Sequence, residues 1–274
     1  MARAICKLGG SAKALVAVGG ASGDRLLQLL SAEKIPVHPV PVCGETRESF
    51  AVTDESSGAQ YRFSLPGQTL TDEDSDRLTT EIASAVSLNR NGYVVLSGGV
   101  APGLGDMFPE RILATISPRT DKLIVDTSKG ALARLIAQPT VPVHILRLDQ
   151  REAEQSVGHA LDTVGDTIAF AEGLIDRGVA GMIVTGRRTE GSILVTTGAR
   201  YICRTPHVPV ISKIGAGDAF VGALTLSLSR GDTPDLALKQ GVAAASATMG
   251  TEGTGLCDLA SVEMLLPQCH VKQV

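Results

Sequence analysis

Short apolar blocks alternate with amphipathic stretches along most of the chain. Each block has the length and the Val, Ile and Leu content of a strand that is buried on both faces. These blocks cover residues 14–18, 93–97, 122–126, 143–146 and 182–185. The stretches with helical spacing cover residues 2–8, 25–33, 72–88, 104–116, 129–137, 234–249 and 258–266, with a longer one that breaks near 158–162. The alternation predicts an α/β fold, a three-layer α/β/α sandwich around a mostly parallel sheet, with residues 193–196 and 200–203 as an antiparallel pair at one edge.

Residues 44–67 depart from this pattern. Residues 45–53 and 59–65 alternate polar with apolar side chains around the turn 54–58, which predicts a β-hairpin with one solvated face. We therefore expect a small hairpin lid that projects from a core made of residues 1–43 and 68–274. A two-stranded hairpin is marginal by itself, so a second copy of the chain is expected to cover its apolar side in a homodimer.

The stretch from Ile214 to Phe220 combines small residues with one carboxylate. Gly215, Ala216 and Gly217 let the backbone turn tightly and approach a ligand, and an apolar run from Ala219 predicts a buried helix. The unpaired N–H groups at a helix start form an anion site. Asp218, beside that site, is the candidate general base. A tight turn with an Asp near an N-cap is the alternative.

Small or polar residues follow several of the expected strands: Ser97-Gly-Gly, Asp126-Thr-Ser, Arg147-Leu-Asp149 and Thr185-Gly-Arg. In a parallel sheet the ligand lies beyond the carboxyl ends of the strands, so these residues are expected to form the rim of one site. The glycines of residues 19–24 are expected in a loop. They match a dinucleotide fingerprint poorly, since no acidic residue follows at the required distance.

The composition of the chain argues against two classes of partner, nucleic acids and membranes. The chain has 274 residues, of which 43% are hydrophobic, and a net charge of −4, which argues against a nucleic-acid surface. Its five cysteines lack CxxC spacing, which favours free thiols in the reducing cytoplasm. There is no run long enough for a membrane span and no signal-peptide pattern, so no membrane partner is expected.

These motifs together resemble the ribokinase-like (PfkB-type) carbohydrate kinase family. Ile214 to Phe220 matches its G-A-G-D-[AS]-F signature, and Ser97 to Gly103, Asp126-Thr-Ser and Gly253-Thr-Gly255 resemble further family motifs. Thr46-Arg47 and Tyr61-Arg62-Phe63 resemble the phosphosugar branch. Within it, the features are most similar to the minor bacterial 6-phosphofructokinases, with 1-phosphofructokinases and tagatose-6-phosphate kinases as near relatives.

The resemblance implies ATP-dependent phosphorylation of a phosphorylated ketose of the fructose 6-phosphate type. Asp218 would take the proton from the sugar hydroxyl, while the N–H groups of Gly215, Ala216 and Gly217 would stabilise the transferred phosphoryl group. Arg47 and Arg62 would bind the phosphate already on the sugar, because the guanidinium fork suits oxyanions.

Further roles follow from the same resemblance. Ser97 and Gly98 would line the sugar site. Asp149 and Glu152 would hold Mg²⁺, and Ser212 would contribute to a monovalent cation site for K⁺. The residues expected around the nucleotide are Arg147, Gly186, Arg188, Gly191, Ser212, Lys213, Gly215, Gly217 and Gly253. Simpler roles stay open: a solvated strand face for the two flap arginines, and an ordinary helix-start charge bias for the acidic pair.

The chain also departs from the family pattern. It opens inside the family's first helix, so the family's sugar-binding Asp strand and Gly-rich segment have no counterpart here. Arg147 stands where the family has a Lys, and Lys213 stands where the near relatives have a Thr. The segment from Gly186 to Gly191 lacks the serine hydroxyl of the family's nucleotide loop and has two additional arginines. These departures favour one alternative, an N-terminally truncated, non-catalytic or weakly active relative that binds nucleotide. A kinase for an unphosphorylated sugar or nucleoside is the second alternative.

Overall fold

A seven-stranded sheet forms the centre of the computed structural model, which describes residues 1–54, 56–57, 59–88 and 91–274. The strand order is β11 (His270–Gln273), β10 (Arg200–Arg204), β9 (Ser192–Thr196), β8 (Ala180–Gly186), β7 (Val143–Leu148), β6 (Leu123–Asp126) and β5 (Val94–Ser97). Neighbouring strands are parallel from β5 to β8 and antiparallel from β8 to β11, so only β9 and β11 run against the rest. This confirms the mostly parallel sheet and its antiparallel edge.

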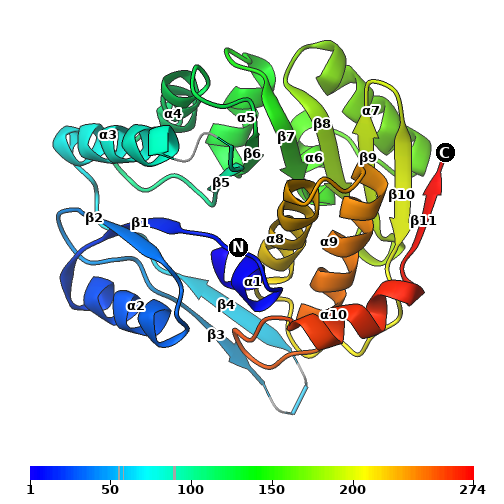
Figure 1. Cartoon of the computed structure of the whole chain (residues 1–274), viewed down its shortest axis with the longest axis horizontal. Coiled ribbons are helices and arrows are strands. Elements are labelled where there is room, and N and C mark those ends of the chain that lie inside the picture. Colours follow the sequence, from blue (N-terminus) through cyan, green and yellow to red (C-terminus); the bar gives the residue numbers. More distant parts are fainter. Residues whose placement is uncertain (55, 58, 89–90) are drawn as a thin grey trace.

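Helices cover both faces of this sheet (Figure 1). Successive strand residues point to opposite faces: Ile124 packs with α1 (Ala2–Lys7), α8 (Ala216–Ser229) and α9 (Pro234–Met249), and Val125 packs on the other side. The helices of that other side include α3 (Asp72–Leu88), α4 (Phe108–Ile116), α5 (Lys129–Ala137) and α7 (Val164–Asp176). The remaining helices are α6 (Gln150–Val157), α10 (Leu259–Leu265) and the short 3₁₀ turns η1 (Arg188–Glu190) and η2 (Leu266–Gln268). The three-layer α/β/α sandwich is confirmed.

The prediction of a loop over residues 19–24 was wrong. Helix α2 (Gly20–Ala32) begins at Gly20, so these glycines form its first turn. A carboxylate from a distant segment makes this possible, because Glu45 accepts hydrogen bonds from the backbone N–H groups of Ala21 and Ser22 at 3.2 and 3.0 Å. Side-chain capping of free N–H groups stabilises a helix start, and the local pattern gives no sign of it.

Two strands were missed. β2 (Val37–Pro41) contains two prolines and pairs in parallel with β1 (Ala14–Val18) in a separate two-stranded sheet. Proline is compatible with a strand at a sheet edge, so its presence hid β2 from pattern analysis. The other missed strand is β11, which pairs antiparallel with β10. β1 was expected to be buried, yet only its last residue, Val18, is buried.

The predicted hairpin is confirmed. β3 (Ser49–Thr53) and β4 (Gln60–Ser64) pair antiparallel in a sheet of their own, with Phe50 opposite Phe63 (Figure 1). Glu55 and Gly58 of the expected turn lie outside the described residues. Within the described ranges, every helix is too short or too polar to cross a membrane.

Candidate active site

The start of α8 and the ends of β6 and β7 meet at one edge of the main sheet. Arg147, near the end of β7, forms an ion pair with Asp126 at the end of β6, with 3.2 Å between Nη1 and Oδ1. A Cβ atom on Gly217 would lie 3.5 Å from Nη2 of Arg147, so the guanidinium packs against the first turn of α8. The small residue at position 217 lets the arginine approach the helix start this closely.

Asp218 lies in the first turn of α8 with its side chain 52% exposed. Its Oδ1 lies 3.6 Å from the amino group of Met1. Gly215 caps the helix with φ of 79°, a left-handed conformation that favours glycine, and the helix begins at Ala216, three residues before the expected apolar start. The first N–H groups of an α-helix have no intrahelical acceptor. That of Ala216 donates to the carbonyl of Lys213 at 3.4 Å. Asp218 lies beside this helix start, and its role as general base stays a prediction.

Several carboxylates surround Arg147. Burial raises the pKa of Asp126, and the nearby charges of Asp218 and Asp149 add to this effect while Arg147 opposes it. Burial also raises the pKa of Glu152, although a hydrogen bond from the backbone N–H of Asp149 opposes the shift. Asp126, Asp149, Glu152 and Asp218 form an acidic group with two cations beside it, the guanidinium of Arg147 and the amino group of Met1. Such an excess of carboxylates favours the binding of a further positive charge.

Asp149 and Glu152 form a capping box at the start of α6. Asp149 Oδ1 accepts from the N–H of Glu152 at 2.8 Å, and Glu152 Oε2 accepts from the N–H of Asp149 at 2.7 Å. Within the described part of the chain, no three metal-ligating side chains are grouped closely enough to hold an ion. The donor chemistry still fits Mg²⁺, which is commonly bound by one or two carboxylates together with substrate phosphates.

The loop before α8 is hydrogen-bonded to the loop after α9. The hydroxyl of Ser212, 3% exposed, donates to the carbonyl of Gly253 at 2.9 Å and accepts from the N–H of Ile214 at 3.2 Å. Lys213, between them, is exposed. The structure thus brings together four of the residues expected around the nucleotide: Ser212, Lys213, Gly215 and Gly253.

The other expected nucleotide loop follows β8 and is held by a residue without an assigned role. Arg187 is 3% exposed, and its guanidinium donates to the carbonyls of Leu161, Asp162 and Thr163 at 3.0 Å each and pairs with Glu190 at 2.7 Å. It therefore ties residues 186–191 to the connection between α6 and α7. Nothing in the local pattern distinguishes it from its neighbour Arg188, which is 69% exposed and 4.0 Å from Glu154.

Gly186 and Gly191 occupy the two ends of this loop. A Cβ atom on Gly186 would lie 4.0 Å from the Cα of Asp149, so the loop starts next to the capping box of α6. Gly191 has φ of 114°, and a Cβ atom there would clash with the carbonyl of Cys203. Only glycine fits this position without moving β10.

The residues expected around the sugar come from two places. Ser97 is paired in register with Asp126 across β5 and β6, and the N–H of Gly98 donates to the carbonyl of Asp126 at 2.9 Å. Asp126, whose strand end was expected on the rim without a role of its own, thus lies between the sugar residues and Arg147. The sequence feature that points to Asp126 as a site residue is its position at the carboxyl end of a parallel strand, where ligands bind.

Arg47 and Arg62 both belong to the hairpin region and are exposed. Arg47 packs near Gly67 and lines a depression of about 770 Å³ between the start of α2 and the segments 45–48 and 65–69 that flank the hairpin. Arg62 lies opposite Ala51, on the face of the hairpin away from its aromatic rings. In the described chain, no carboxylate lies within ion-pair distance of either guanidinium.

A model of the pfkB family carbohydrate kinases matches residues 1–260. The chain belongs to this family. This PfkB kinase is 34% identical to the ATP-dependent 6-phosphofructokinase isozyme 2 of Mycobacterium tuberculosis, over 96% of this chain and 76% of that protein. It is 32% identical to the ATP-dependent 6-phosphofructokinase isozyme 2 of Escherichia coli K12, over 94% of this chain and 82% of that protein. Its structure is similar to that of the E. coli phosphofructokinase-2 in complex with potassium, with a TM-score of 0.90 and 30% identity over 97% of this chain and 85% of that one.

The family membership confirms the resemblance drawn from the sequence and makes the protein an ATP-dependent carbohydrate kinase. The individual site residues remain predictions, which the geometry above supports to different degrees. Asp218, Ser212 and Gly253 lie around one helix start, whereas Arg47 and Arg62 lie on the separate hairpin region.

Proposed function

We propose that this PfkB kinase transfers the γ-phosphoryl group of ATP to fructose 6-phosphate. The observation that carries the proposal is the half-exposed carboxylate of Asp218 beside the first N–H groups of α8. An acceptor hydroxyl at that point would meet both a base for its proton and donors for the transferred phosphoryl group. The relatives with 34% and 32% identity are both named as ATP-dependent 6-phosphofructokinases, which favours this sugar phosphate.

Arg47 and Arg62 would bind the 6-phosphate. Both are exposed cations without a carboxylate partner in the described chain, so their guanidinium groups are available for an anionic ligand. Ser97 and Gly98 would contact the sugar beside Asp126. Arg147 would compensate the charge of the nucleotide phosphates from its position against Gly217.

ATP would be enclosed by two regions. One is the loop that contains Gly186, Arg188 and Gly191, and the other is the pair of loops that the Ser212 hydroxyl joins. Mg²⁺, held by Asp149 and Glu152 with Asp126 nearby, would neutralise charge on the phosphates. The E. coli structure is named as a potassium complex, and the buried Ser212 hydroxyl beside the Gly253 carbonyl offers oxygen ligands of the kind that K⁺ requires.

Residues 44–67 would serve as both lid and dimer contact on the core of residues 1–43 and 68–274. Phe50, Val52, Tyr61 and Phe63 lie on one face of the hairpin and are 51%, 48%, 55% and 48% exposed. An apolar face of this kind on an isolated two-stranded sheet favours burial by another molecule. A homodimer through the hairpin accounts for it, and we place the working enzyme in the cytoplasm.

The test is an ADP-release assay with ATP, Mg²⁺ and a panel of acceptors. Fructose 6-phosphate is expected to give the highest kcat/KM, above fructose 1-phosphate, tagatose 6-phosphate, fructose and adenosine. Higher kcat/KM with one of the other phosphates would reassign the substrate. Tight ATP binding without turnover on any acceptor would instead support the non-catalytic alternative.

A further inference from the structure

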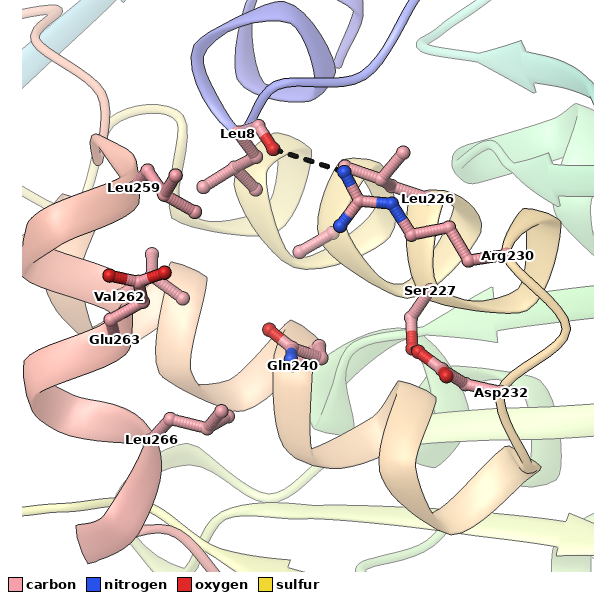
Figure 2. Close-up of a pocket in the computed structure, with 11 residues that line it drawn as sticks. Leu8, Leu226, Ser227, Arg230, Asp232, Gln240, Leu259, Val262, Glu263 and Leu266 are labelled. Carbon is pink, nitrogen blue, oxygen red and sulfur yellow. Dashed lines mark hydrogen bonds between the residues drawn. The ribbon is translucent and has the colours of Figure 1, made fainter.

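A cavity of about 180 Å³ lies at the far end of α8 from Asp218 (Figure 2). It is enclosed by the end of α1, the last turns of α8, the middle of α9 and one side of α10. Arg230 lies twelve positions after Asp218, which corresponds to roughly 18 Å along a helix. The cavity is therefore distinct from the phosphoryl-transfer site.

The interior of the cavity is apolar. Leu226 and Val262 are 8% and 2% exposed, and Leu8 and Leu266 add further aliphatic surface, while Leu259 is 45% exposed at the mouth. In Figure 2, Leu259 at the start of α10 and Leu266 in η2 point into the space between them and the helices α8 and α9. An engineered protein cavity of about 150 Å³ accepts benzene, so this volume suits one aliphatic or aromatic side chain.

The rim carries one guanidinium, two carboxylates and one amide, namely those of Arg230, Asp232, Glu263 and Gln240, and the Arg230 and Glu263 side chains are exposed. The guanidinium of Arg230 donates a 3.5 Å hydrogen bond to the carbonyl of Leu8, and it has no carboxylate partner among the residues that the structure describes. Within that same part of the chain, no hydrogen bond or ion pair engages the side chains of Glu263 or Gln240. Asp232, by contrast, already accepts from the Ser227 hydroxyl at 2.6 Å.

We propose that this cavity binds a free α-amino acid with an apolar side chain. Its carboxylate would pair with Arg230, its ammonium group with Glu263 and the amide oxygen of Gln240, and its side chain would lie among the leucines. A fatty acid would leave the Glu263 carboxylate next to a second anion, and an amine would place a second cation beside Arg230. Because Asp232 is already hydrogen-bonded to Ser227, Arg230 and Glu263 are the two charges left for a ligand, and a zwitterion complements both.

Isothermal titration calorimetry of the full chain with L-leucine and L-phenylalanine tests the proposal. One ligand per chain is expected to bind. Three fragments serve as controls: glycine lacks the apolar body, 4-methylpentanoate lacks the ammonium group, and 3-methylbutylamine lacks the carboxylate. Each fragment is expected to bind at least about tenfold more weakly than leucine, since each loses one of the three contacts.

Variants of the rim locate the site. Arg230→Gln and Glu263→Gln are each expected to weaken leucine binding about tenfold or more, and Leu259→Trp is expected to fill the mouth and abolish it. Arg204→Gln, which removes an exposed arginine from β10, is the matched control and is expected to bind leucine normally. Unchanged kinase activity and melting temperature would show that each variant is folded.

Three results would overturn the proposal: no binding of either amino acid at millimolar concentration, equal binding of 4-methylpentanoate, or unaltered leucine binding by the Arg230 and Glu263 variants. The measurement reads binding alone. Its failure is therefore separate from any failure of the proposed sugar-phosphate kinase activity.

Discussion

The start of α8 and the hairpin β3–β4 carry the two halves of the proposed chemistry and are built in opposite ways. At the helix start, Arg147 is fixed by Asp126 at 3.2 Å and by its packing on Gly217, and Ser212 is hydrogen-bonded on both sides. On the hairpin, the aromatic face is about half exposed, and Arg62 has no ion-pair partner within the described ranges.

The difference shows which groups a chain positions by itself and which depend on another molecule. The residues that we propose to handle charge in the reaction lie on elements packed by the main core, so their geometry is set before any ligand arrives. Residues on the hairpin have unused binding capacity on both faces. We infer that the substrate and a second copy of the chain complete this region.

The largest effect is expected at the helix start. Asp218→Asn keeps the shape of the side chain but removes its basicity, so kcat for fructose 6-phosphate is expected to fall by about 10³-fold. ATP affinity, measured by calorimetry, should stay within a few-fold. Asp235→Asn in the first turn of α9 is the matched control and should retain full activity. A loss of less than tenfold in the Asp218 variant would remove the general-base role.

On the hairpin, Arg47→Ala and Arg62→Ala are each expected to lower kcat/KM for fructose 6-phosphate by roughly 10- to 100-fold, because each removes a charged hydrogen bond to phosphate. The KM for ATP should hardly change. Arg204→Ala reports the effect of losing an exposed arginine elsewhere. If both hairpin variants keep normal kcat/KM, the protein is better described as a kinase for an unphosphorylated acceptor.

The aromatic face offers a third comparison. Within one hairpin the rings of Phe50 and Phe63 stack with 4.9 Å between their centroids. Phe63→Asp places a charge on this face, which we propose contacts the hairpin of a second copy. We expect at least a tenfold weaker dimer in light scattering after gel filtration, since an unpaired buried charge is costly. Ser64→Asp, on the opposite face of the same strand, should leave the dimer intact. A wild-type chain that is monomeric at micromolar concentration would contradict the proposal.

The smallest effect concerns pH. Burial raises the pKa of Asp126 and of Glu152, so both carboxyls hold protons at higher pH than usual. Their raised pKa values favour the folded state at low pH, and this contribution is lost as the pH rises through them. Mg²⁺ competes with these protons, so its affinity should weaken as the pH falls toward the raised values, by up to about tenfold per pH unit for each proton displaced.

Calorimetry of Mg²⁺ binding in the presence of ADP, repeated at several pH values, measures how the Mg²⁺ affinity changes with pH. Glu152→Gln is expected to flatten this pH dependence, whereas Arg62→Ala should not alter it, because the guanidinium stays charged throughout this range. An affinity that is independent of pH in the wild-type chain would show that these carboxylates do not hold the ion.

Much of the fold was predictable because strong periodic patterns are local. The apolar blocks placed β5, β6, β7 and β8 within two residues of their observed limits, and the spacing after Thr233 placed α9 at residues 234–249. The errors share a cause, namely stabilisation from distant residues. The first turn of α2 depends on Glu45, and β11 forms only because β10 lies beside it.

For the candidate site, the sequence by itself determined the small residues and the carboxylate at the start of α8, because backbone access to an anion requires small residues in consecutive positions. The polar strand ends were also local features. Only the tertiary structure decided that Arg147 packs against Gly217 and that a cavity opens among α8, α9 and α10. It also decided that Arg187 is buried and hydrogen-bonded to three carbonyls while Arg188 is exposed. These facts depend on which side chains the fold brings together and which it buries, and the order of residues along the chain does not encode that in any local pattern.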